Sequence, residues 1–147
     1  MARVLLTGMS GAGKTTLLQE VASRGYLTVD TDYGGWTLSN GLWDEARIEA
    51  LLAANGTVAV SGTVENQVRF YGTFDDVVLL SAPIEVLLER VRTRADNPYG
   101  RTPEDQAAIR RYTREVEPLL RRSATVELDG RRPVAELADV VEKLLRR

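Results

Sequence analysis

The sequence predicts an α/β fold in which helices cover both faces of a parallel sheet. Short segments rich in valine and leucine alternate with segments whose apolar residues recur at helical spacing. Strands of nearly continuous apolar character are typical of a parallel sheet that is buried on both faces. The chain of 147 residues is 44% hydrophobic, which is enough for one core, so we expect a single domain over residues 1–147.

The predicted strands and helices follow one another along the chain. We expect strands at residues 2–7, 26–29, 57–60, 77–80 and 125–128. We expect helices at residues 16–22, 44–54, 83–94, 103–122 and 133–145. Asn55 and Gly56 form a stop signal after the second helix. Pro83, Pro103 and Pro133 each stand where a helix begins, a position at which proline is favoured.

Composition narrows the functional classes. The chain has no cysteine and no histidine, which excludes disulfides and cysteine zinc sites and leaves a carboxylate or water as any general base. The net charge of -2 lacks the basic footprint of nucleic-acid binding. No charged leader precedes the first strand, and no apolar run approaches the length of a membrane span. We therefore expect a cytoplasmic monomer without nucleic-acid or membrane partners.

Residues 8–15 match the phosphate-binding loop pattern G-x-x-x-x-G-K-[ST], between an apolar strand and a helix. In such a loop, backbone N–H groups and the start of the next helix face phosphate oxygens. Lys14 is the only lysine before Lys143, so it is not one lysine among many. The predicted nucleotide contacts are Gly8, Ser10, Gly11, Ala12, Gly13, Lys14, Thr15 and Thr16. The alternative is a glycine-rich turn ahead of an ordinary helix.

Two carboxylates, Asp30 and Asp32, stand at the end of the second predicted strand. In a parallel α/β sheet, ligands bind beyond the carboxyl ends of the strands, which is the side of the phosphate loop. We expect Asp32 to orient an acceptor hydroxyl and Asp30 to hold the water shell of a metal ion. The alternative is a turn in which an aspartate side chain binds the backbone.

The segment after the third strand is dense in polar groups. Thr63 is placed to cap a helix, with Asn66 or Gln67 one turn into it. Glu65, Asn66 and Arg69 exceed what a cap needs, so we expect substrate contact from at least one of them.

Arginines flank a predicted loop at residues 97–100. Arg90 and Arg94 are one helical turn apart, and Arg101 follows the Asn-Pro and Tyr-Gly turn signals. Arginine presents a fixed charge and a two-pronged donor that suits phosphoryl oxygens. The pattern predicts a short helical lid at about residues 94–104 that closes over phosphates and excludes water. The alternative is a solvated helix surface.

Taken together, these motifs resemble the small P-loop kinases of the adenylate kinase and shikimate kinase group. The phosphate loop, the D-x-D of Asp30 and Asp32, and the R-x-x-x-R of Arg90 and Arg94 carry the resemblance. Residues 129–134 are similar to the D-G-x-x-P-V turn that packs beside adenine in nucleoside monophosphate kinases, which implies nucleotide contacts for Arg132 and Pro133. The resemblance also implies a three-layer α/β/α fold with a five-stranded sheet in the order 2-3-1-4-5.

The departures from this group concern the acceptor. Residues 61–64 replace the D-G-F-P-R element of nucleoside monophosphate kinases, and Gly62 alone remains of the glycine-rich stretch of shikimate kinases. Residues 33–36 stand where shikimate kinases carry an arginine. Four aromatic residues could line an acceptor pocket or belong to the core: Trp36, Trp43, Phe70 and Tyr71.

The sequence thus predicts an ATP- and Mg²⁺-dependent phosphotransferase that acts on the hydroxyl or phosphate of a small molecule. Lys14 and Arg94 would offset charge on the transferred group, Thr15 would ligate Mg²⁺ with support from Asp30, and Asp32 would accept or orient the acceptor proton. One alternative is a nucleoside or nucleotide kinase. Another is an ATP-binding module that signals to a partner without efficient phosphoryl transfer.

Overall fold

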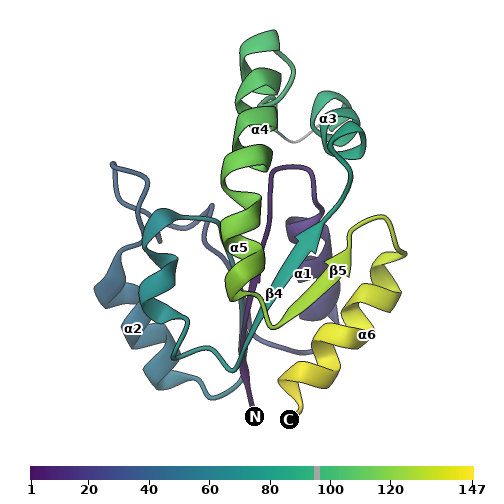
Figure 1. Cartoon of the computed structure of the whole chain (residues 1–147). Coiled ribbons are helices and arrows are strands. Elements are labelled where there is room, and N and C mark those ends of the chain that lie inside the picture. Colours follow the sequence, from purple (N-terminus) through teal and green to yellow (C-terminus); the bar gives the residue numbers. More distant parts are fainter. Residues whose placement is uncertain (95–96) are drawn as a thin grey trace.

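The computed structural model, which describes residues 1–94 and 97–147, contains a five-stranded parallel sheet with the order β2-β3-β1-β4-β5. The strands are β1 (Arg3–Thr7), β2 (Thr28–Asp30), β3 (Val58–Ser61), β4 (Asp76–Ser81) and β5 (Val126–Asp129). Figure 1 shows β4 and β5 of this sheet side by side, with the helix α6 (Val134–Leu145) next to β5. Each predicted strand is present, and the order that the resemblance implied is confirmed.

The central strand β1 explains why continuous apolar segments form this sheet. Leu5 pairs with Val60 of β3 on one side and with Val77 of β4 on the other. All three side chains are buried. A strand hydrogen-bonded on both edges and covered on both faces has no position for a polar side chain along its middle.

Helices cover both faces of the sheet. The helical elements are α1 (Lys14–Ser23), α2 (Glu45–Ala54), the 3₁₀ helix η1 (Glu65–Phe70), α3 (Ile84–Thr93), α4 (Pro103–Glu115), α5 (Glu117–Ser123) and α6 (Val134–Leu145). Helices α1 and α6 pack against each other, and their apolar residues form one core cluster with β1 and β4. Helix α2 and η1 form a second cluster with β1 and β3.

Local signals begin and end these helices. The Asp44 side chain accepts a hydrogen bond from the Arg47 N–H and caps α2. The Thr102 hydroxyl caps α4 in the same way, with Pro103 as the first helical residue. Both caps lie where the sequence predicts a helix to begin.

One predicted helix is wrong in its continuity. Residues 103–122 form two helices, α4 and α5, which are separated at Val116. Pro118 causes the break, because it has no N–H to donate to the carbonyl of Arg114 and its ring crowds that carbonyl.

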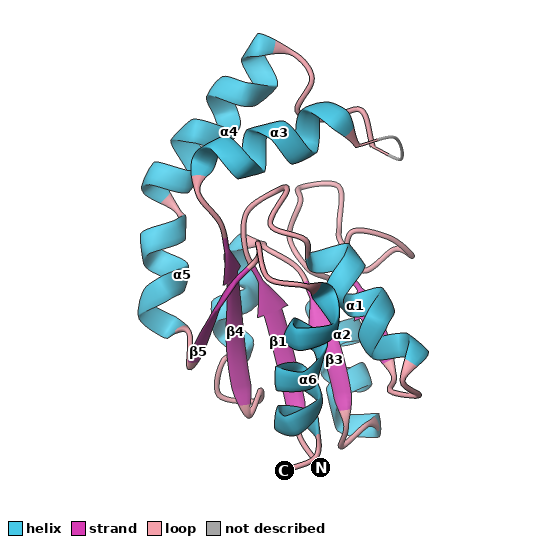
Figure 2. Cartoon of the chain, turned by 90° about the vertical axis from the view of Figure 1, so that its right-hand side faces the viewer, coloured by secondary structure: helices cyan, strands magenta, loops and turns pink. Residues whose placement is uncertain are grey.

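Helices α3 and α4 lie beyond the carboxyl ends of the strands (Figure 2). They meet in a small apolar cluster of Leu88, Val91 and Ile109, with Tyr99 packed against it. Residues 95 and 96, which belong to the predicted lid, lie outside the described residues. Within the described ranges, no helix has the length and apolar character needed to span a bilayer.

Candidate phosphoryl-transfer site

The loop between β1 and α1 turns sharply into the helix. Gly13 has φ of 104°, a left-handed backbone conformation that residues other than glycine rarely adopt. It directly precedes the first turn of α1. The Lys14 ammonium folds back over the loop and donates hydrogen bonds to the carbonyls of Gly8 at 2.6 Å and Met9 at 3.3 Å. The lysine therefore lies on the same side of the loop as the cavity described below.

The electrostatic surroundings of Lys14 link it to both predicted carboxylates. Burial lowers the pKa of the Lys14 ammonium, Asp32 and then Asp30 oppose this by raising it, and Arg94 lowers it further. Lys14, Asp30, Asp32 and Arg94 are therefore close enough to act on one another's charge. The structure thus brings together residues from three separate segments of the chain: Lys14, the Asp30 and Asp32 pair, and Arg94.

The Asp30 carboxylate makes two contacts. One oxygen accepts a hydrogen bond from the Thr15 hydroxyl at 3.1 Å, and the other accepts one from the Asp32 N–H at 3.1 Å. The second contact is the backbone-binding turn considered as the alternative for this motif, so that alternative is correct for Asp30. The first contact places two hard oxygen ligands side by side at the start of α1. This donor set fits Mg²⁺, which prefers one or two protein oxygens together with phosphates and water.

Asp32 differs from Asp30, because no described residue forms a hydrogen bond or ion pair with its carboxylate. Burial raises the pKa of the Asp32 carboxyl above its usual range, Lys14 opposes this, and Asp30 adds to it. A carboxylate with raised basicity and accessible oxygens can accept a proton from a hydroxyl.

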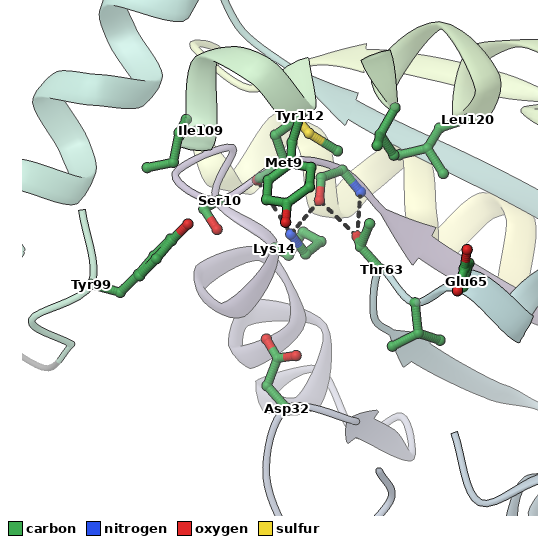
Figure 3. A pocket seen from close by; sticks show the side chains of 13 residues that line it. Met9, Ser10, Lys14, Asp32, Thr63, Glu65, Tyr99, Ile109, Tyr112 and Leu120 are labelled. Carbon is green, nitrogen blue, oxygen red and sulfur yellow. Dashed lines mark hydrogen bonds between the residues drawn. The ribbon is translucent and has the colours of Figure 1, made fainter. Parts of the chain in front are cut away.

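Lys14 and Asp32 share one cavity of about 650 Å³ (Figure 3). Its lining comprises Gly8, Met9, Ser10, Lys14, Asp32, Thr63, Val64, Glu65, Tyr99, Ile109, Tyr112, Val116 and Leu120. The cavity joins the phosphate loop and the ends of β2 and β3 to α4 and α5. Its volume suits a small molecule.

One wall of the cavity was missed by the sequence interpretation. Ile109, Tyr112, Val116 and Leu120 recur at intervals of three or four residues and face the cavity from α4 and α5. This spacing is the sequence signal for the wall, and the arginines of the same segment lie between its members. Tyr99 adds an aromatic side chain from the loop before α4.

Thr63 holds the phosphate loop and does not cap a helix, so that prediction is wrong. Its hydroxyl lies 2.7 Å from the Gly8 carbonyl oxygen, 3.2 Å from the Gly8 nitrogen and 3.0 Å from the Thr7 hydroxyl. The start of η1 is satisfied instead by the Gln67 side chain, whose oxygen accepts the Val64 N–H at 3.0 Å. The Thr63 hydroxyl bonds to Thr7, the last residue of β1, and to Gly8, and both of these residues are buried beside it.

The predicted acceptor residues separate into two groups. Glu65 lines the cavity together with Asp32. Gly62 packs against Thr31 and the Trp43 ring. Asn66 bonds to the backbone of Trp43 at 3.0 and 3.1 Å, and Arg69 pairs with Glu45 at 3.4 Å. Gly62, Asn66 and Arg69 thus serve internal contacts and lie outside the lining.

The aromatic residues also separate. Trp43 and Phe70 are buried in the core and meet edge to face, with ring centroids 5.8 Å apart. Trp36 lies under the Arg47 guanidinium, 4.0 Å from the ring centroid. Tyr71 accepts a hydrogen bond from Gln67 at 3.0 Å. These contacts place Trp43 and Phe70 in the core and not in an acceptor pocket.

Arg90 occupies the other side of the phosphate loop. Its guanidinium donates to the carbonyls of Gly11 and Ala12 at 3.2 Å each and of Gly130 at 2.8 Å. It lines a second cavity of about 280 Å³ together with Ala12, Gly13, Thr16, Leu17, Gly130, Arg132, Val134 and Leu137. Pro133 stands between two of these residues, at the start of α6. The structure therefore gathers Arg90, Arg132 and part of the phosphate loop around one hollow.

Arg94 and Arg101 lie on the loop before α4. Arg94 donates to the carbonyls of Asn97 at 3.2 Å and Tyr99 at 2.9 Å. Arg101 is exposed and donates to the Arg94 carbonyl at 2.6 Å. Arg94 thus braces the loop that carries Tyr99, and its charge acts on Lys14 and Asp32.

A phosphate loop at the first strand of a 2-3-1-4-5 parallel sheet, with a lysine and two carboxylates beside it, defines a P-loop nucleotide-binding protein of kinase type. A family described as AAA domain matches residues 4–111. The chain belongs to this family, and its relatives show that it is a small P-loop kinase of the shikimate kinase and adenylate kinase group.

Relatives and solved structures agree with this assignment. A shikimate kinase of Aromatoleum aromaticum is 30% identical over 152 residues, covering 88% of this chain and 85% of the relative. A shikimate kinase of Nitrobacter winogradskyi is 32% identical over 142 residues, covering 80% of this chain and 64% of the relative.

Three solved structures share the fold along nearly the whole chain. The shikimate kinase of Bacteroides thetaiotaomicron has a TM-score of 0.73 at 19% identity, with 99% of each chain covered. The shikimate kinase of Acinetobacter baumannii in complex with shikimate has a TM-score of 0.71 at 21% identity, covering 99% of this chain and 92% of that one. A gluconokinase of Sinorhizobium meliloti has a TM-score of 0.66 at 21% identity, with the same coverages of 99% and 92%. These structures show the shared fold, and the shikimate kinase relatives make the chain a small-molecule kinase by family.

Proposed function

We propose that this kinase uses ATP and Mg²⁺ to phosphorylate a hydroxyl group of a small molecule bound in the 650 Å³ cavity. The observation that carries the proposal is that Lys14 and Asp32 line the same cavity. One is the phosphate-loop cation, and the other is a carboxylate with no described partner. A phosphoryl donor and a hydroxyl would then meet between a charge that stabilises the transferred group and a base that accepts the proton.

The phosphate loop and its neighbours would bind the nucleotide. Backbone N–H groups of residues 8–15 and the Lys14 ammonium would contact phosphate oxygens. The Thr15 hydroxyl and the Asp30 carboxylate, 3.1 Å apart, would hold Mg²⁺ directly and through water. When bound, Mg²⁺ would neutralise part of the charge on the β- and γ-phosphates.

The second cavity would receive the nucleotide base. Arg90 and Arg132 flank it, and Leu17 and Leu137 provide apolar contact. Pro133, the residue just before α6, lies in sequence between Arg132 and Val134, which both line this cavity. This position supports the same role for Pro133. The resemblance of residues 129–134 to the adenine-side turn of related kinases agrees with this placement.

Transfer would then need little covalent help from the protein. The acceptor oxygen forms a bond to the γ-phosphorus, the bond from that phosphorus to the ADP oxygen breaks, and the hydroxyl proton passes to the Asp32 carboxylate. Lys14 and Arg94 would offset charge on the phosphoryl oxygens as they move between donor and acceptor. Closure of the lid at residues 94–104, which carries Arg94, Tyr99 and Arg101, would exclude water.

A screen for ADP release tests the proposal. ATP, Mg²⁺ and single acceptors are incubated with the protein, and a reaction without acceptor measures background hydrolysis. We expect release to rise severalfold with at least one hydroxyl compound. Nucleosides and nucleotides are included, because turnover confined to them would identify a nucleoside or nucleotide kinase. Failure of every acceptor, despite measurable ATP binding, would favour an ATP-binding module that signals to a partner.

The Lys14→Ala variant makes the screen specific to the phosphate loop. It should abolish acceptor-dependent ADP release and weaken ATP binding while the circular dichroism spectrum is kept, because Lys14 contacts only loop carbonyls. Lys143→Ala is the matched control, since Lys143 lies on α6 away from the loop and should leave activity unchanged. Near-normal turnover by Lys14→Ala would contradict the assignment of the loop.

A further inference from the structure

The charges that line the acceptor cavity are unevenly distributed. Among the lining residues that the structure describes, Lys14 is the only lysine or arginine, whereas Asp32 and Glu65 are both acidic. Lys14 already binds the loop carbonyls and belongs to the phosphate side in the proposed function. The acceptor side is therefore left with two carboxylates and no cation of its own.

Two exposed arginines of α4 point away from the cavity. The side of α4 and α5 that faces the cavity carries Ile109, Tyr112 and Val116. With 3.6 residues per turn, Arg110 and Arg114 lie about 100° to 140° around the helix from Ile109. Both are exposed, so a rigid closure of this helix would present its apolar face, and not its arginines, to the acceptor.

Other arginines near the cavity have partners. Arg47 lies over the Trp36 ring and donates to the Gly34 carbonyl at 2.7 Å. Arg69 pairs with Glu45 and is 70% exposed. Arg111 is exposed and lies 5.2 Å from the centroid of the Tyr112 ring. None of these three belongs to the described lining. The charge of Arg94 does reach Asp32, but its guanidinium donates to the carbonyls of Asn97 and Tyr99 and is not part of the described lining.

Glu65 is placed to contact the acceptor. No hydrogen bond or ion pair joins its carboxylate to a described residue, in contrast to Glu45, which binds both Asn66 and Arg69. Figure 3 shows Glu65 and Tyr99 on opposite sides of the view, with Lys14 between them. The carboxylate thus borders a cavity whose wall between Tyr99 and Leu120 is apolar and aromatic.

We propose that the acceptor is an amino alcohol: a small molecule with an apolar body, a hydroxyl that faces Asp32, and a protonated amine that pairs with Glu65. An ammonium group would pair with the Glu65 carboxylate, which is exposed in the free protein, whereas an acceptor carboxylate would meet two like charges. The inference rests on the proposed function and assigns Glu65 as a specificity-determining residue. It separates this chain from its shikimate kinase relatives, because shikimate carries a carboxylate.

The test compares acceptors that differ in charge on a constant skeleton. One set is gluconate, glucitol and 1-amino-1-deoxyglucitol, and a second is mandelate, 1-phenylethane-1,2-diol and 2-amino-1-phenylethanol. Shikimate and its methyl ester form a third pair. We expect kcat/KM from coupled ADP release to be highest for an amino alcohol and to be at least tenfold lower for the hydroxy acid of the same skeleton.

Variants at Glu65 connect this preference to the structure. Glu65→Gln should lower the ratio of kcat/KM for the amino alcohol to that for the neutral alcohol by about tenfold, mainly through KM, the loss expected when one charged partner is removed from a pair. Glu65→Lys should raise kcat/KM for the hydroxy acids. Glu49→Gln, an exposed carboxylate on α2 outside the cavity, is the matched control and should not alter the ratio. ATP affinity, measured by titration calorimetry, should stay within twofold in all three variants.

The outcomes separate this inference from the proposed function. Preferred turnover of gluconate, mandelate or shikimate would overturn the amino-alcohol assignment and leave the kinase proposal standing. Preference for an amino alcohol that Glu65→Gln does not change would also overturn it, because the amine would then be bound elsewhere. Absence of acceptor-stimulated ADP release with every compound would overturn both.

Discussion

The guanidinium of Arg90 donates a hydrogen bond of 2.8 Å to the carbonyl of Gly130. The same group reaches the carbonyls of Gly11 and Ala12, so one side chain joins α3, the phosphate loop and the turn after β5. Gly130 permits this approach, because a Cβ there would lie 2.5 Å from the Ala12 carbonyl oxygen. Arg90 therefore supports the loop from behind in addition to lining the second cavity.

Replacing Arg90 by lysine should weaken nucleotide binding. One ammonium cannot donate to three separated carbonyls, and each lost hydrogen bond to a charged group is worth about 1.5–3 kcal/mol. We expect the free energy of unfolding to fall by about 1–3 kcal/mol, since part of this loss is recovered by water. The Kd for ATP should rise by at least about tenfold, the equivalent of 1.4 kcal/mol. Urea denaturation and titration calorimetry measure the two effects.

Arg92→Lys is the control for this variant, because Arg92 lies on the same helix and pairs with the exposed Glu89. It should change neither quantity measurably. Wild-type ATP affinity in Arg90→Lys would show that the three carbonyl contacts do not hold the loop in its binding conformation.

Protonation of Asp32 should determine how kcat falls as the pH is lowered. A general base works only when ionised, and burial raises the pKa of Asp32 above its ordinary value near 4. As pH falls, kcat should therefore begin to decline at a higher pH than for an ordinary aspartate. Asp32→Asn should reduce kcat by on the order of 10²-fold and remove this decline, while sparing ATP affinity.

The exposed Asp139, which pairs with Arg24 on the surface, supplies the comparison. Asp139→Asn should keep the wild-type profile. Parallel losses of ATP affinity and kcat in Asp32→Asn would instead indicate that Asp32 serves the metal ion.

The segment between α3 and α4 should become protected when nucleotide binds. Its described residues 97–102 are exposed or half-buried apart from Gly100, and such segments open readily. Hydrogen exchange at residues 97–104 and in the phosphate loop should slow on addition of ATP and Mg²⁺. Arg94→Ala should lower kcat and reduce this gain together, because Arg94 both braces the loop and influences the site by its charge.

Arg110→Ala, an exposed change on α4, should leave the exchange pattern as it is in the wild type. Identical hydrogen exchange with and without nucleotide would indicate that Arg94 and its neighbours form a solvated surface and not a lid.

Gly62 should prove necessary for stability. A Cβ at this position would lie 2.3 Å from the Thr31 hydroxyl and 3.2 Å from the Trp43 ring. That hydroxyl is buried and accepts the Trp43 indole N–H at 2.9 Å, so it cannot move freely. Gly62→Ala should cost about 1–3 kcal/mol in free energy of unfolding, which is typical of overpacking. Gly72→Ala places its Cβ in open space and should change stability far less in the same urea titration.

The order of strands and helices could be predicted because periodicity and composition encode it locally. Buried strands such as Val58–Ser61 are apolar up to their last residue, and helix starts such as Thr102 and Pro103 carry their own capping signals. The break at Val116 was also encoded, since Pro118 stands four residues after Arg114. It was missed because the regular spacing of apolar residues continues across the break.

Fewer contacts of the candidate site could be predicted from local sequence patterns. Asp32, Glu65 and Lys14 were predicted from motifs and share one cavity. Thr63 was assigned to a cap because its actual partner, Gly8, lies 55 residues away in sequence. Contacts of this kind are set by strand pairing, which sequence spacing does not reveal.

The wall formed by α4 and the loop before it has a thermodynamic consequence. Tyr99 and Tyr112 border the acceptor cavity, and the loop that carries Tyr99 is braced by Arg94, whose charge reaches the phosphate-loop lysine. A ligand that orders this segment from one side therefore prepares it for a ligand on the other side. Because such coupling is reciprocal, ATP and acceptor would raise each other's affinity by the same factor. Binding would then be synergistic, and neither ligand alone would hold the segment closed as firmly as the pair.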